Sequence, residues 1–162
     1  MPFIFVCTVV LYYLIVIIFG GIFLVELLAP AGTWEALKAA VESGANAVYL
    51  SGKSFGARAF ADNFDEESLK KAVTFAHMRN VSIHVTVNTL VDNSELPALA
   101  NYLIFLYTIG VDAIIVQDLG VAKIAHEIVP DLPLHASTQM SINNLDSVKM
   151  LEKLHFSRVV LA

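Results

Sequence analysis

The stretch from Val25 to Asn63, VELLAPAGTWEALKAAVESGANAVYLSGKSFGARAFADN, contains the plan on which the rest of the chain is built. It reads as a short apolar strand, a turn, a helix, a second strand and a long polar loop. Thr33 is suited to cap the helix at its N-terminus, and Gly44 is suited to end it, because glycine adopts the left-handed conformation at little cost. Strands that alternate with helices predict a parallel sheet with right-handed crossovers.

This plan repeats to the C-terminus. Three segments echo one another, each a helix end followed by a corner and a buried strand: ESGANAVYL, TIGVDAIIV and KLHFSRVVL. We expect six strands, at residues 25–28, 46–50, 82–87, 112–116, 133–136 and 158–161, and helices between them at residues 34–43, 66–79, 95–108, 119–129 and 144–154. Asp65 and Ser94 precede two of these helices and are suited to cap them.

Repeating units of about 25–35 residues are typical of a TIM-like (β/α)8 barrel, so we expect an α/β fold of this kind. The alternative is a doubly wound sheet, but the turn APAG after the first strand is not the GxGxxG fingerprint of that fold. A closed barrel needs eight strands, and the six expected here predict a partial barrel. Its free strand edges would favour aggregation, or pairing with a partner chain that completes the barrel.

The composition of the chain argues against several classes of function. The 162 residues suffice for one domain, and the formal net charge is -5, with 15 acidic and 10 basic residues. A nucleic-acid surface is usually basic, so none is expected. A single cysteine, Cys7, cannot form a disulfide, a zinc knuckle or an iron–sulfur cluster within this chain. The sequence therefore predicts neither a metal site nor a bound cofactor.

Residues 1–24 form an apolar segment that we separate from the domain expected over residues 25–162. No charged side chain precedes Glu26, and the run from Phe3 to Phe19 is long enough to cross a bilayer as a helix. Basic residues lie only downstream, which favours a cytoplasmic C-terminal part, anchored to the membrane if the helix forms. Two alternatives stay open: a buried strand pair, because β-branched and aromatic residues are common in the run, or a translation start assigned too early.

Polar residues alternate with apolar ones in two expected strands. Because side chains in a strand point to opposite faces in turn, apolar residues such as Ile83 should face the helices and the others should face the barrel interior. The expected interior residues are Ser82, His84, Thr86 and Asn88 in one strand and His135, Ser137 and Gln139 in the other. Barrel interiors are normally apolar, so this polar face is informative. We expect His84 and Glu26 to pair there as structural filling.

Barrel sites form at the C-terminal ends of the strands, and two residues there are candidates for catalysis. His135 is a candidate general base, since the pKa of histidine lies near neutrality. The alternative is a hydrogen-bonded core histidine. Asp118 could polarise a group at the barrel mouth, but capping of the helix that begins at Leu119 is the simpler role.

Other polar residues near the strand ends are candidates for substrate binding: Arg58, Asn63, Asn88, Ser137 and Gln139. Arg58 could bind a carboxylate through two parallel hydrogen bonds. The alternative is a salt bridge from Arg58 to Asp62 or Asp65, which would serve only the loop.

Several motifs together resemble the collagenase-like peptidases of unknown catalytic type, the thirty-second family of that group. The resemblance covers residues 26–162. The matching stretches are ELLAPAG (26–32), GANAVYL (44–50), FGARAFADNF (55–64), VTVNTL (85–90), GVDAIIVQDLG (110–120), LHASTQMSINN (134–144) and RVVLA (158–162). Relatives usually begin near ELLAPAG and continue past RVVLA, so the apolar leader is foreign to the family pattern.

The resemblance implies the N-terminal part of a TIM-like barrel that hydrolyses a peptide or protein substrate, in an incomplete copy. Some relatives serve instead in oxygen-independent hydroxylation of ubiquinone precursors or transfer RNA. Those relatives are expected to bind a four-iron cluster through cysteines beyond the region seen here, so a cluster is implied only if cysteines follow in a longer protein. An inactive, membrane-tethered fragment is the third alternative.

Overall fold

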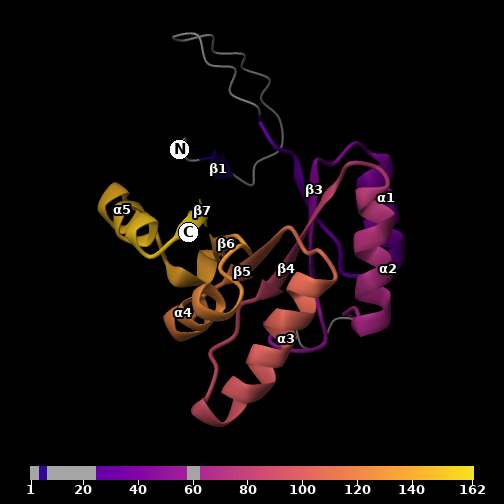
Figure 1. Cartoon of the computed structure of the whole chain (residues 1–162). Coiled ribbons are helices and arrows are strands. Elements are labelled where there is room, and N and C mark those ends of the chain that lie inside the picture. Colours follow the sequence, from indigo (N-terminus) through magenta and orange to yellow (C-terminus); the bar gives the residue numbers. More distant parts are fainter. Residues whose placement is uncertain (1–3, 7–24, 58–62) are drawn as a thin grey trace.

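The computed structural model of the chain describes residues 4–6, 25–57 and 63–162. Strands and helices alternate along the chain, as the sequence predicts (Figure 1). The strands are β1 (Ile4–Val6), β2 (Leu28–Pro30), β3 (Ala47–Ser51), β4 (Ser82–Val87), β5 (Ala113–Val116), β6 (Leu134–Ala136) and β7 (Phe156–Val160). The helices are α1 (Trp34–Glu42), α2 (Glu66–His77), α3 (Leu96–Thr108), α4 (Leu119–Ile128) and α5 (Leu145–Lys153), with single 3-10 turns η1 (Asn93–Glu95) and η2 (Thr138–Met140).

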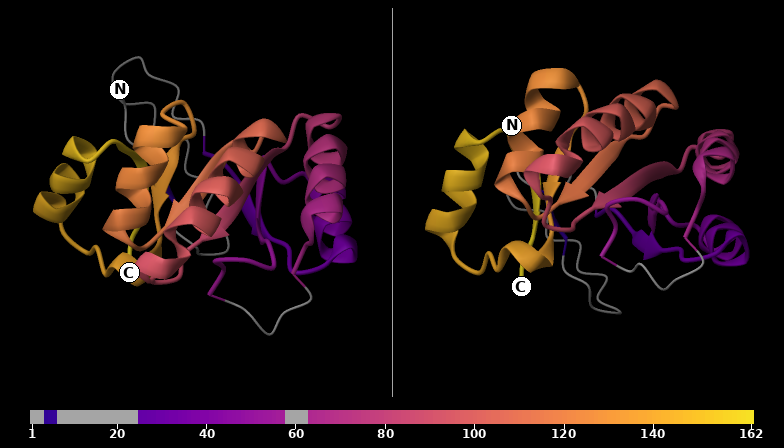
Figure 2. Two further views of the ribbon diagram at one scale, coloured as in Figure 1. Left: turned by 60° about the horizontal axis from the view of Figure 1, so that its bottom comes forward. Right: turned by 90° about the horizontal axis from the view of Figure 1, so that it is seen from below.

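The strands form one parallel sheet in the order β1-β7-β6-β5-β4-β3-β2. From β2 to β7 each strand pairs with the next one along the chain, which is the order of a barrel and not of a doubly wound sheet. The sheet curls, and the helices lie along its outer side (Figure 2). The expected partial TIM-like barrel is therefore confirmed as a curled half-barrel of six parallel strands, to which β1 is added.

The strand β1 corrects the prediction for the apolar segment. Ile4–Val6 is not part of a membrane helix but pairs in parallel with β7, Ile4 opposite Arg158 and Val6 opposite Val160. Among residues 4–6, 25–57 and 63–162, no helix is long and apolar enough to cross a membrane. The predicted transmembrane helix over residues 3–19 is thus wrong where the structure describes it, and the rest of that run lies outside the described residues.

The core lies between the sheet and the helices. Ile83, Val85 and Val87 of β4 are fully buried and belong to the core cluster, together with Leu69 of α2 and Leu103 of α3. The period-two alternation therefore places the apolar residues of β4 on the helix side, as expected. The other face of the same strand carries His84, which is also buried.

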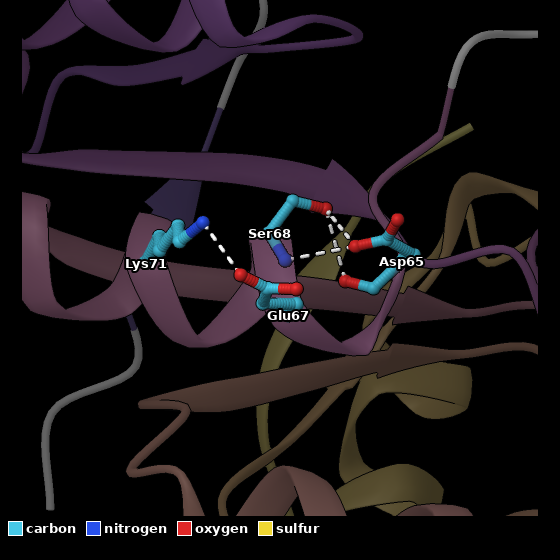
Figure 3. Close-up of polar contacts among 4 residues, drawn as sticks. All are labelled: Asp65, Glu67, Ser68 and Lys71. Carbon is cyan, nitrogen blue, oxygen red and sulfur yellow. Dashed lines mark hydrogen bonds and ion pairs between the residues drawn. The ribbon is translucent and has the colours of Figure 1, made fainter.

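Side-chain caps begin most of the helices. Thr33 accepts a hydrogen bond from the backbone N–H of Ala36 at 3.2 Å, and Asp65 accepts one from Ser68 at 2.8 Å (Figure 3). Ser94 is not a cap, contrary to the prediction. Asp92 caps the turn η1 instead, and Oε2 of Glu95 accepts a hydrogen bond from the backbone N–H of Asp92 at 2.9 Å. This reciprocal pair is a capping box, in which two otherwise unpaired donors are satisfied together.

Candidate functional site

Two histidines lie together on the inner face of the half-barrel. His84 in β4 and His135 in β6 are only 4% and 6% exposed, and their rings meet edge to face with centroids 4.7 Å apart. The inward position of each histidine follows from the alternation in its strand, since the residues on either side of it point toward the helices. The two imidazoles form the polar centre of an interior that branched apolar residues usually fill.

A buried ion pair lies beside the histidines. Arg158 of β7 donates two hydrogen bonds to Glu26, Nη1 to Oε1 at 2.8 Å and Nη2 to Oε2 at 2.6 Å. This two-fold geometry is the one in which a guanidinium matches a carboxylate best. The hydrogen bond from Arg158 lowers the pKa of the Glu26 carboxyl, against the opposing effect of burial. The pair joins the chain just before β2, the first strand of the half-barrel, to β7, its last strand.

The expected pair between His84 and Glu26 is therefore not formed. Glu26 is bonded to Arg158, and Nδ1 of His84 is buried with no hydrogen-bond partner among the described residues. Arg158 was not among the residues predicted to face the interior, although the sequence indicates it. It is the one charged residue within the apolar strand FSRVV, at the parity of an interior position.

The environment of the histidines controls their protonation. Burial, the neighbouring His84 and the positive charge of Arg158 lower the pKa of His135 to about 2. Burial and Arg158 also lower the pKa of His84. Both rings are therefore neutral near pH 7 and can donate or accept hydrogen bonds. A group with so low a pKa is a weak proton acceptor, so this geometry favours His135 as a hydrogen-bonding group over a general base.

Asp118 and Asn88 hold loops at the C-terminal ends of the strands. Asp118 caps α4, its Oδ1 accepting from Gly120 N at 2.7 Å, while Oδ2 accepts from Val91 N at 3.3 Å. The capping role proposed for Asp118 is thus present. Asn88 Oδ1 accepts from the backbone N–H of Ala57 at 3.1 Å and so ties the loop after β3 to the end of β4.

Ser137 and Gln139 follow β6 directly, two residues apart. Ser137 is 4% exposed and caps the turn η2, its hydroxyl accepting from Gln139 N at 3.3 Å. Gln139 therefore lies beside Ser137 at the mouth, and His135 is the next residue inward at the same parity. The structure brings these three predicted residues together along one strand end.

The loop after β3 holds the remaining predicted residues. Asn63 is 6% exposed, which places its amide inside the loop region and not on an open surface. Arg58 lies outside the described residues. Its predicted alternative partner, Asp65, accepts from Ser68 and also forms an ion pair with Lys53 at 3.8 Å. Among the described residues, no three histidine, cysteine, aspartate or glutamate side chains come together as a metal site would require.

The comparisons with known proteins identify the family. The model of peptidase family U32 matches residues 32–162. The chain belongs to this family. The solved structure of a U32 peptidase superposes with a TM-score of 0.70 over 84% of this chain and 57% of that one, at 14% identity. At that identity the match supports the fold, which agrees with the curled half-barrel seen here. The resemblance read from the motifs is thereby confirmed.

Curated relatives are named for both of the activities that the resemblance implies. The tRNA hydroxylation protein P1 of Bacillus subtilis is 39% identical over 137 residues, 85% of this chain. A 23S rRNA 5-hydroxycytidine synthase of Escherichia coli is also 39% identical over 137 residues and 85% of this chain. A collagenase of Porphyromonas gingivalis is 30% identical over 137 residues. The expected peptidase is therefore supported only in part, by the family and by relatives such as this collagenase, whereas the two relatives at 39% identity are named for RNA hydroxylation, the alternative that the resemblance implies.

The chain spans only part of these relatives. It corresponds to 32% of the Bacillus subtilis protein, 20% of the Escherichia coli synthase and 32% of the collagenase. The relatives' names therefore describe proteins about three to five times as long as the region that this chain matches.

Proposed function

We propose that this chain is the barrel part of an RNA hydroxylation protein, acting on nucleosides of transfer or ribosomal RNA. The observation that carries the proposal is the 39% identity, over 85% of the chain, to two proteins named for that activity. The polar inner face supports it, because neutral His84 and His135 with the Arg158–Glu26 pair give a half-barrel interior that can hydrogen-bond a polar small molecule or base.

The charges of this chain do not favour direct binding of the RNA backbone. Most of the described cations already have partners. The pairs are Lys38–Glu42, Lys53–Asp65, Lys71–Glu67, Lys123–Glu127 and Arg158–Glu26, and Lys70 and Arg79 lie over the rings of Phe105 and Phe75. Affinity for RNA comes largely from free cations that neutralise phosphates. We therefore infer that contacts with the RNA backbone come from the parts of the whole protein that these residues do not include.

An iron–sulfur cluster, which the resemblance implies for hydroxylating relatives, does not fit the residues present. Such clusters are usually held by four cysteine thiolates, and the sequence contains one cysteine. The proposal therefore assigns no step to a cluster on this chain. What these residues contribute is a polar centre of two buried, neutral imidazoles, together with the loops that Asn88 and Asp118 hold at the C-terminal ends of the strands.

A chimera tests the proposal in a protein of full length. In Bacillus subtilis lacking its tRNA hydroxylation proteins, the matching segment of protein P1 would be replaced by residues 25–162 of this chain. We expect hydroxylated nucleosides to return to the tRNA, measured by mass spectrometry of digested RNA. A stable chimera that restores none, while unaltered P1 does, would contradict the proposal.

Two variants of the chimera sharpen the test. His135→Asn keeps a neutral hydrogen-bonding group but removes the ring, and we expect it to lower the hydroxylated fraction. His126→Asn changes an exposed histidine on the outer face of α4 and serves as the matched control. An equal loss of hydroxylated nucleosides in both variants would indicate that the substitutions lower the stability of the chimera, and not that the barrel interior has a specific role.

A further inference from the structure

The loop that follows β3 folds back over the C-terminal end of its own strand. Phe64 closes the base of the loop, since its N–H donates to Ser51 O at 3.0 Å and its carbonyl accepts from Lys53 N at 3.1 Å. A Cβ atom at Gly56 would collide with Oγ of Ser51, so the backbone of residue 56 lies directly against the strand end. Barrel sites are built from such loops at the C-terminal ends of the strands.

Phe55 in this loop has a backbone conformation that bulky residues rarely adopt. Its φ is 59°, in the left-handed region that favours glycine. Its ring packs against the ring of Tyr102 in α3, with centroids 5.8 Å apart. Backbone strain of this kind persists only where the surrounding structure imposes it, and it is concentrated at active sites and ligand-binding loops. The conformation of the loop is therefore imposed by its contacts and does not follow from local preference.

Two side chains from the neighbouring strand hold the loop in this conformation. Asn88 and Thr89 follow β4 directly, and β4 pairs with β3. Oδ1 of Asn88 accepts from Ala57 N at 3.1 Å, and Oγ1 of Thr89 donates to the carbonyl of Phe55, also at 3.1 Å. Because β4 also carries His84, these two hydrogen bonds fix the loop relative to the histidines of the inner face.

We propose that Asn88 and Thr89 are positioning residues of the proposed RNA hydroxylation. They hold residues 55–57 against the end of β3, and the loop so held contacts the RNA nucleoside and orients it. The two side chains act through the loop and do not themselves touch the nucleoside. This inference rests on the proposed function and deepens it, because it assigns the contact with the nucleoside to one loop of the half-barrel.

Hydrogen exchange at the backbone N–H of Ala57 tests the geometry on the intact chain. Asn88→Ala removes the accepting oxygen, so we expect exchange at Ala57, followed by NMR, to become about three- to tenfold faster, as for the loss of one hydrogen bond. Asn88→Asp keeps an accepting oxygen and should exchange no faster than the unaltered chain. Equal exchange rates in Asn88→Ala and the unaltered chain would overturn the proposal.

The chimera with protein P1 tests the role of the loop in hydroxylation. Thr89→Val keeps the shape of the side chain but removes the hydroxyl that holds Phe55. We expect Thr89→Val and Asn88→Ala each to lower the hydroxylated fraction, at equal amounts of chimera, by about tenfold, since a displacement of 1 Å can cost about 100-fold in rate. Thr89→Ser and Asn88→Asp, which keep the donor and the acceptor, should restore hydroxylation.

Thr108→Val is the matched control for Thr89→Val. Oγ1 of Thr108 donates to the carbonyl of Ile104 at 2.7 Å, so this substitution also removes a bond from a threonine hydroxyl to a backbone carbonyl. Thr108 is the last residue of α3, which leads into the start of β5, and it is remote from the C-terminal ends of the strands. The control should hydroxylate like the unaltered chimera. Equal losses in Thr89→Val and Thr108→Val would indicate an effect on stability and would overturn the positioning role.

Failure of this inference differs from failure of the proposed function. Suppose the unaltered chimera is active, and Thr89→Val and Asn88→Ala hydroxylate equally well although Ala57 exchanges faster in Asn88→Ala. The positioning role is then overturned, and the proposed function stands. An unaltered chimera that restores no hydroxylated nucleosides contradicts the proposed function itself, and the role of the loop in hydroxylation is overturned with it.

Discussion

At the residue scale, His135 links the acid stability of the fold to the burial of one ring. Its pKa is about 2 in the folded chain and near 6.5 when exposed. Between these values the unfolded chain binds a proton that the folded chain does not, so stability falls as the pH drops below 6.5. At pH 5 the loss from this residue is about 2 kcal/mol, and His84 adds to it in the same direction.

This loss can be measured by urea unfolding at pH 7 and pH 5. We expect His135→Asn to reduce the difference in unfolding free energy between the two pH values, because the titrating ring is gone. His126→Asn, on the exposed face, is the control and should keep the difference of the unaltered chain. An unchanged difference in His135→Asn would show that the ring is not buried in a neutral form.

The Arg158–Glu26 pair gives a second prediction at this scale. Glu26→Gln removes the carboxylate but leaves the guanidinium buried, its side chain being 9% exposed. Breaking a buried pair from one side costs about 3–5 kcal/mol, and the partial exposure of Glu26 places this case near the lower end. Urea unfolding at pH 7 would measure the loss.

The double variant Glu26→Gln with Arg158→Met provides the control for that loss. Removing the guanidinium as well takes away the unpaired charge, so we expect the double variant to recover much of the stability. A double variant that is less stable than Glu26→Gln alone would mean that the guanidinium contributes through contacts other than the ion pair.

At the scale of the element, two substitutions of Asp118 distinguish a role in capping α4 from a role in catalysis. Asp118→Ala removes the side-chain cap of α4 and the hydrogen bond from Val91 N, and should cost about 1–2 kcal/mol in thermal or urea unfolding. Asp118→Asn keeps an amide oxygen that caps nearly as well but replaces Oδ2 with an NH2 group that cannot accept from Val91 N, so it should lose stability, though less than Asp118→Ala. Chimeric protein P1 with Asp118→Asn then reports on the carboxylate itself. Full hydroxylation in that variant would leave Asp118 with a capping role alone.

The sequence could predict the elements because their signals are local. Helix caps such as Thr33 and Asp65 and left-handed corners such as Gly44 and Gly110 act within a few residues, and the structure shows all four in those roles. The third echoing segment has His155 at the corner where the first two have glycine, and it still adopts φ 67°. At this corner the tertiary context overrides the preference of histidine for negative φ. Only the repeat of the three segments indicates the left-handed conformation there.

The site was less predictable because its contacts join distant parts of the chain. Parity places His84 and His135 on the inner face, but it does not say that their rings touch. The partner of Glu26 is 132 residues away, and nothing local marks it. The buried hydroxyl of Tyr102 has no hydrogen-bond partner among the described residues, and the apolar sequence of helix α3 gives no sign of it.

At the scale of the whole molecule, β1 covers the edge of β7 that the next strand of a barrel would occupy. Ile4–Val6 therefore takes the place of the next barrel strand, although it comes from the opposite end of the sequence. No local sequence pattern indicates this pairing. An uncovered strand edge presents unpaired N–H and C=O groups and favours pairing with another chain. We expect the chain without residues 1–24 to self-associate more than the full chain at equal concentration, as measured by sedimentation velocity.

Substitutions in β1 test the same point without shortening the chain. Successive backbone N–H groups of a strand point to opposite sides, so changing both Ile4 and Phe5 to proline removes the donor that faces β7 whichever of the two it is. The double proline variant should self-associate like the shortened chain, whereas the same positions changed to alanine keep their N–H groups and should behave like the full chain. If the proline variant sediments like the alanine variant, β1 does not protect the edge of β7. Another feature must then prevent the sheets of two molecules from pairing.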